Sequence, residues 1–126
     1  MANRDKLFQT FGEILYVVAK SDGIVQNEEI SVLKDLVASH PFGKEIQWSF
    51  DYEQSKDTPI DMLYKKTVAI LSDHGPDREY EFLIYALEKI AHASEGLHKN
   101  EEEVLTNFSR DLLERLKNFN YDDIEE

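Results

Sequence analysis

A short pattern of residues occurs twice in the chain, and it constrains the fold more than any other feature. Residues 19–29 read Ala-Lys-Ser-Asp-Gly-Ile-Val-Gln-Asn-Glu-Glu, and residues 92–102 read His-Ala-Ser-Glu-Gly-Leu-His-Lys-Asn-Glu-Glu. In both copies an apolar segment with helical spacing leads into Ser-acid-Gly, and Asn-Glu-Glu opens a second such segment. Glycine commonly ends a helix and asparagine commonly begins one. Each copy therefore predicts a helix-turn-helix corner.

Apolar residues recur at three- and four-residue spacings along most of the chain, which is typical of helices with one buried face. The sequence favours no strand. Thr58 is expected to cap the fourth helix, with Pro59 at its first position. A polar connection is expected over residues 54–58, and residues 118–126 read as a frayed tail. The expected helices span about residues 5–20, 27–39, 43–53, 59–73, 77–93 and 100–117.

These helices predict one all-α domain over residues 1–126, a compact bundle of about six or seven helices. The first and second helices should pair as a hairpin, and so should the fifth and sixth. The repeated pattern suggests that the two hairpins are pseudo-equivalent and pack together.

The chain is acidic, with 14 basic and 26 acidic residues and a formal net charge of −12. Nucleic-acid binding without sequence specificity depends on neutralising phosphates, so this charge argues against a nucleic-acid partner. The same field favours metal cations and protein partners with a basic surface. Cysteine is absent, which excludes disulfides and is compatible with a cytoplasmic location. No apolar run of about 18 residues is present, so we expect no membrane insertion. The oligomeric state does not follow from the sequence.

The first copy of the pattern matches only the second half of an EF-hand calcium loop. That loop requires glycine at position 6 and glutamate at position 12, which Gly23 and Glu29 provide. Positions 1 and 3 should carry oxygen ligands, but they are Val18 and Lys20. The second copy fails at the same positions, so neither copy alone is an EF-hand.

Two interpretations of the repeated acidic residues stay open. In the first, the paired corners bring carboxylates of both copies together, and these recruit a divalent cation such as Ca²⁺, Mg²⁺ or Mn²⁺. In the second, the same residues cap and solvate the helix ends, and no metal binds.

The repeated pattern, in an all-helical chain of this length, resembles the TerB family of tellurite-resistance proteins and a related domain of a membrane-anchored DnaJ-like co-chaperone. The likeness covers about residues 7–37 and 80–116. It implies a bundle of about seven helices, a role in stress or tellurite-resistance-type responses, no catalytic activity, and a divalent-metal site. Carried over by position, the metal ligands would be Asp22, Glu29, Glu95 and Glu102.

The second copy departs from the family pattern at two positions. Glu95 stands where the family has aspartate, and Lys99 occupies the usual capping position. Any metal site built from both copies depends on how these two residues are placed.

Histidines offer a second kind of candidate site. His92 and Glu95 stand three residues apart, and His98 and Glu102 stand four apart, spacings that place two side chains on one helix face. Such pairs can bind transition metals. Histidines near helix ends also serve as capping or surface groups, which is the competing interpretation.

An aromatic patch is the last candidate, and it is formed by Phe42, Trp48, Phe50 and Tyr52. It predicts either part of the core or a partner-binding groove. No catalytic triad, phosphate-binding glycine loop or dinucleotide motif is present. We therefore expect a non-catalytic TerB-like module that binds a divalent metal. The alternatives are a purely structural acidic protein-interaction domain without metal, and a divalent-metal enzyme, which would need a cleft around the carboxylates.

Overall fold

The structure, a computed structural model, describes residues 2–21, 25–75, 77–93, 103, 106–108 and 110–111. This part of the chain contains helices and turns and no strand, as the sequence predicts. Residues 103, 106–108 and 110–111 are helical and fall within the last expected helix. The five helices with defined bounds are α1 (Ala2–Lys20), α2 (Asn27–Ala38), α3 (Gly43–Lys56), α4 (Ile60–His74) and α5 (Glu79–Ala91).

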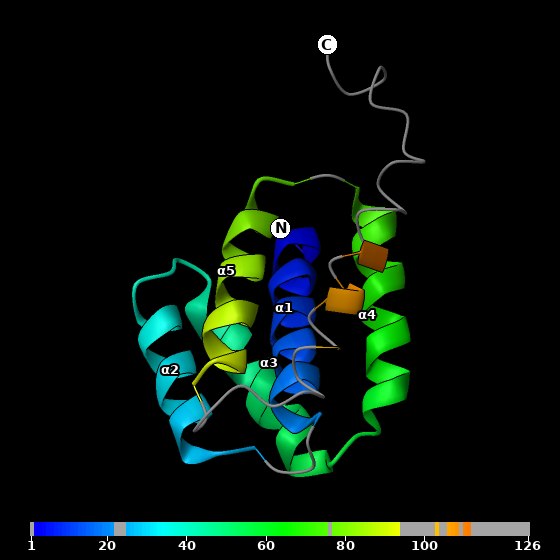
Figure 1. Cartoon of the computed structure of the whole chain (residues 1–126). Coiled ribbons are helices and arrows are strands. Elements are labelled where there is room, and N and C mark those ends of the chain that lie inside the picture. The colour runs from blue at the N-terminus through cyan, green and yellow to red at the C-terminus, as the bar shows by residue number, and fades with distance from the viewer. Residues whose placement is uncertain are drawn as a thin grey trace.

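Helix α1 lies at the centre of the bundle, with α4 on one side and α5 on the other (Figure 1). It packs against α3, α4 and α5, and every residue from Thr10 to Ala19 is buried. The sequence predicts one wide apolar stripe on this helix. The structure instead buries residues 10–19 on all sides, which is the environment of a core helix, and leaves Asp5 and Lys6 exposed.

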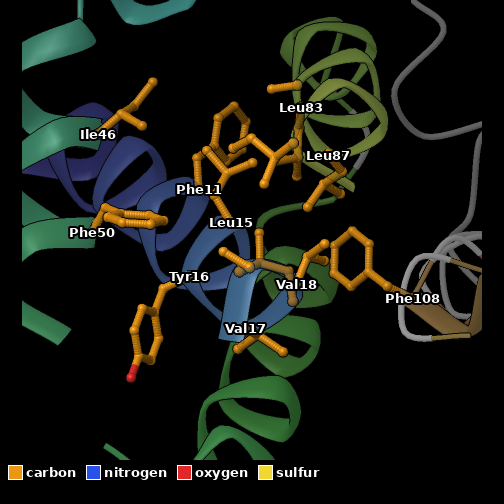
Figure 2. Packing of buried hydrophobic residues seen from close by; sticks show 14 of the residues in the cluster. Phe11, Leu15, Tyr16, Val17, Val18, Ile46, Phe50, Leu83, Leu87 and Phe108 are labelled. Atoms are coloured by element: carbon orange, nitrogen blue, oxygen red, sulfur yellow. The ribbon is translucent and has the colours of Figure 1, made fainter. Parts of the chain in front are cut away.

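The apolar core is one cluster to which all five helices contribute, and Figure 2 shows the part of it around α1. Phe11 and Leu15 of α1 point toward Leu83 and Leu87 of α5. Phe108, from the last helical segment, is fully buried at the edge of the same cluster.

On another side of α1, glycine lets α3 approach closely. A Cβ atom at Gly12 would stand 2.4 Å from the backbone oxygen of Ile46 and 2.8 Å from the Cβ of Ser49. The Ser49 hydroxyl donates a 2.6 Å hydrogen bond to the backbone oxygen of Gln9 across the same contact. The two backbones can therefore lie this close only because residue 12 has no side chain.

Helix α2 does not form the expected hairpin with α1. It packs instead against α3 and α5, while α1 makes its main contacts with α3, α4 and α5. The second expected hairpin involves residues outside the described part of the chain. The described residues therefore do not contain the pair of equivalent hairpins that the repeat suggests.

His40 attaches the end of α2 to the start of α5. Its Nδ1 accepts a 2.9 Å hydrogen bond from the backbone N–H of Phe42, so the neutral ring carries its proton on Nε2. Nε2 lies 3.1 Å from a carboxylate oxygen of Glu79, to which it donates. The ring also packs against Phe8 and Phe82, with centroids 5.1 and 4.5 Å away.

The junction between α3 and α4 differs from the sequence-based expectation. Helix α3 continues through the expected polar connection to Lys56, and Asp57 ends it in the left-handed conformation, with φ 52°. The N-cap of α4 is Pro59, not Thr58. The Thr58 hydroxyl donates to the buried carboxylate of Glu53 at 2.5 Å. The predicted cap is wrong because this bond holds the Thr58 side chain against the end of α3.

The close approach at Gly12 makes a direct prediction about stability. Alanine favours a helix interior by about 1 kcal/mol over glycine. We nevertheless expect Gly12→Ala to lower the free energy of unfolding by about 1–3 kcal/mol, because its methyl group meets backbone atoms that cannot move aside alone. Urea denaturation measures the change. Ser31→Ala on the exposed side of α2 is the control and should change stability by less than about 0.5 kcal/mol. A Gly12→Ala variant as stable as the parent would contradict the packing.

Candidate functional site

The structure describes one of the four predicted metal ligands. Asp22, Glu95 and Glu102 lie outside the described residues. Glu29 is described and is fully buried in the first turn of α2. The distance between the two copies of the motif is therefore not defined, and the four-carboxylate site stays a prediction.

Glu29 has a clear structural role. Its Oε1 accepts a 2.8 Å hydrogen bond from the backbone N–H of Gln26, the residue at the N-cap of α2. This contact is one half of a capping box, in which the glutamate of the first turn reaches back to the start of the helix. The negative charge also suits the positive end of the helix dipole. Capping therefore accounts for Glu29 without a metal.

Two of the three described histidines contact carboxylates within the fold. His40 pairs with Glu79, and Nε2 of His74 lies 2.9 Å from the carboxylate of Asp77. His92 is exposed at the end of α5. Its predicted partner Glu95, and the pair His98–Glu102, lie outside the described residues. Within residues that the structure describes, no group of three or more metal-binding side chains comes together.

A polar hollow of about 290 Å³ lies between α1 and α4, and its principal feature is an ion pair. Lys66 Nζ of α4 lies 3.0 Å from Oε2 of Glu13, whose residue is only 9% exposed in the middle of α1. Lys6 and Thr10, from the two preceding turns of α1, line the same hollow. Acidic and basic side chains are thus mixed there, and the hollow presents no single sign of charge.

Burial raises the pKa of the Glu13 carboxyl above its ordinary value. Loss of hydration is the largest cause, and the hydrogen bond and charge of Lys66 oppose it. The nearby charge of Glu53 adds to the rise, while Lys6 lowers it slightly. The net direction means that the fold favours the neutral form of Glu13 more than water does.

The aromatic patch divides into two opposite faces of α3. Phe50 is fully buried and packs edge-to-face on Tyr16, with ring centroids 5.8 Å apart. Phe42, just before α3, stacks on Phe8 with centroids 4.5 Å apart. Trp48 is on the other face of α3, because two residues along an α-helix correspond to a rotation of about 200°. The core interpretation therefore holds for only half of the patch.

The exposed half of the patch is a row of three side chains. Trp48 is 57% exposed and Tyr52 is 42% exposed. Their rings stack almost parallel, with centroids 5.3 Å apart and an interplanar angle of 16°. Lys56, four residues further on, places its ammonium 5.4 Å from the centre of the Tyr52 ring. We call Trp48, Tyr52 and Lys56 the α3 row.

Sequence reasoning missed Glu13 and Lys66 and did not separate the α3 row from the core. A signal for Glu13 was present, since it is the one charged residue in the stretch from Thr10 to Ala19. A signal for the row was the four-residue spacing of Trp48, Tyr52 and Lys56, offset by two from that of Phe42, Ile46 and Phe50.

The capping role of Glu29 predicts a loss of stability that does not depend on metal ions. Glu29→Ala should lower the free energy of unfolding by about 1–2 kcal/mol, because the Gln26 N–H loses its acceptor. Thermal unfolding in Ca²⁺, Mg²⁺, Mn²⁺ or a chelator should show the same difference from the parent. Glu28→Ala, an exposed change in the same turn, is the control, with an expected effect of about 0.5 kcal/mol. A metal-dependent rise in melting temperature that Glu29→Ala abolishes would instead support the four-carboxylate site.

The raised pKa of Glu13 predicts a particular pH dependence. Between its ordinary pKa of 4.5 and its higher pKa in the fold, the folded chain binds more protons than the unfolded chain. The contribution of Glu13 to stability therefore falls as pH rises through this window. Glu13→Gln, which is neutral at every pH, should be at least as stable as the parent at pH 7. Its advantage should shrink as pH falls through the folded pKa.

Denaturant titrations of both proteins from neutral to acidic pH measure this difference. Lys66→Gln removes the cation that lowers the pKa of Glu13, so it should extend the window to higher pH. A Glu13→Gln variant that is less stable at pH 7, with a deficit that disappears in acid, would show that the Lys66 ion pair outweighs desolvation.

No membrane-crossing helix, judged by length and apolar character, occurs in the described part of the chain. Comparisons of the chain with protein families, curated proteins and solved structures find no match.

Proposed function

We propose that the chain is a non-catalytic, TerB-like helical module of the cytoplasm that binds a protein partner with a basic surface, in a stress-response setting. The observation that carries this proposal is the exposed, stacked pair Trp48–Tyr52 on the outer face of α3. The proposal corresponds to the metal-free alternative among the functions that the sequence leaves open.

The aromatic pair supports a protein interface because of its exposure and its rigidity. Tryptophan and tyrosine are enriched among the residues that dominate binding energy at interfaces. The stack restrains both rings before any partner arrives, so binding would lose little side-chain entropy at this point. The apolar residues that the bundle needs for its core, such as Ile46 and Phe50, are on the other face of α3.

Charge supports a basic partner. A chain with a net charge of −12 attracts cationic surfaces over about one Debye length, roughly 8 Å at physiological salt, and repels acidic ones. Such a field increases the rate of encounter more than it increases final affinity. The aromatic pair would then supply the short-range contact that holds the partner.

The placement of Glu29 favours this function over the metal-linked one. Of the four carboxylates proposed as metal ligands, the one that is described is buried and holds the start of α2 through Gln26. As a metal ligand it would have to act inside the fold, because none of its surface is exposed. Asp22, Glu95 and Glu102 remain the residues on which the metal interpretation depends.

Calorimetric titration with three peptides of equal length tests the proposal, using basic, neutral and acidic sequences as probes. The basic peptide should bind, and its affinity should fall as salt rises. The double variant Trp48→Ala/Tyr52→Ala should weaken binding by about 2 kcal/mol, roughly 30-fold. Met62→Ala, an exposed apolar change on α4, should have no effect. Equal binding of the acidic and basic peptides, or no binding at all, would rule out the proposed function.

A further inference from the structure

The two ends of the α3 row differ in what covers them. The Tyr52 ring has two neighbours, the Trp48 ring that stacks on it and the Lys56 ammonium 5.4 Å from its centre. Trp48 stacks on Tyr52 through one face only, and more than half of its surface is exposed. The open face of the indole is therefore the free end of a stacked row that already holds a cation at its other end.

We propose that this open face of Trp48 binds an arginine side chain of a basic partner segment, an inference that rests on the proposed function. Indole is the best of the aromatic side chains at attracting a cation over its face. A guanidinium is planar, so it can stack on the ring and still donate hydrogen bonds from its edge. An arginine would therefore fit this place better than a lysine.

One carboxylate on α3 is placed to receive the edge of such a guanidinium. Glu45 stands three residues before Trp48, one turn away on the side of the helix opposite Tyr52, and it is partly exposed. Asp51 stands three residues after Trp48, in the turn of Tyr52, and its carboxylate already accepts a hydrogen bond from Gln47 at 2.9 Å. The indole and Glu45 together match a cation that is flat and rich in donors.

Two other charged groups affect what can bind at the indole face. A second copy of the chain would bring another net charge of −12 to the contact, which opposes association. Lys44, four residues before Trp48, is exposed and belongs to the same side of α3. Its charge repels an incoming arginine, so Lys44→Ala should strengthen arginine binding.

Trp48 is the only tryptophan in the chain, and its fluorescence therefore reports on this face alone. The probes are an arginine-rich peptide and two versions of the same length in which lysine or citrulline replaces every arginine. We expect saturable quenching or a shift of emission, with the arginine peptide binding several-fold more tightly than the lysine peptide. Citrulline, which keeps the shape but has no charge, should bind at least tenfold more weakly.

Variants measured by calorimetry complete the test. Trp48→Ala should weaken the arginine peptide at least tenfold, and Lys44→Ala should tighten it about two- to threefold. Tyr85→Ala is the matched control, because Tyr85 on α5 is also exposed and also carries a lysine, Lys89, over its ring at 5.3 Å. The control should bind the peptide as the parent does.

The possible failures are distinct. Calorimetric binding of basic peptides without a change in Trp48 emission, and without an effect of Trp48→Ala, would overturn the arginine site but leave the proposed function standing. No binding of any basic peptide would overturn both. Emission that changes with protein concentration alone, with dimers seen in sedimentation, would show that a second copy covers Trp48 and would also overturn the arginine site.

Discussion

The burial of α1 from Thr10 to Ala19 is the constraint on which the rest of the structure depends. A helix enclosed by α3, α4 and α5 must satisfy every polar side chain that it carries inward. Thr10 does so within its own helix, by donating to the backbone oxygen of Lys6 at 2.8 Å. Glu13 cannot, and it takes Lys66 from α4 as its partner. The position of α4 along α1 is therefore fixed by an electrostatic contact as well as by apolar packing.

Buried glutamates join helices and turns in other parts of the fold too. Glu29 holds the start of α2 by accepting a hydrogen bond from the backbone N–H of Gln26. Glu53 accepts a hydrogen bond from the hydroxyl of Thr58 at the turn into α4. With Glu13, these are three carboxylates withdrawn from the surface of a very acidic chain. Acidic residues in this sequence therefore have two separate roles, as buried hydrogen-bond partners within the fold and as charges on its surface. A motif rich in glutamate does not by itself indicate a ligand site. Burial distinguishes the two roles, and sequence spacing does not.

Local periodicity was enough to predict the helices but not their neighbours. The predicted bounds of α2 and α5 agree with the structure within about two residues. Local contacts fix both starts, because Glu29 accepts from the backbone N–H of Gln26 and Asp77 accepts from that of Glu79. The pairing of α1 with α2 was expected from adjacency in sequence. The structure replaces it with the α1–α3 contact, which depends on the missing side chain of Gly12. Such a contact joins residues far apart in the chain, and no local pattern encodes it.

The same distinction separates the two halves of the aromatic patch. Composition places Phe42, Trp48, Phe50 and Tyr52 in one group, but helix geometry sends Phe50 into the core and turns Trp48 and Tyr52 outward. Neither side chain of the outward pair belongs to the buried core cluster or packs against it. The pair leaves apolar area in water, where its most favourable use is to bind another molecule. The net charge of −12 favours the approach of a cationic group over that of a neutral or anionic one. A stacked indole is a surface on which such a group can bind while it keeps its charge.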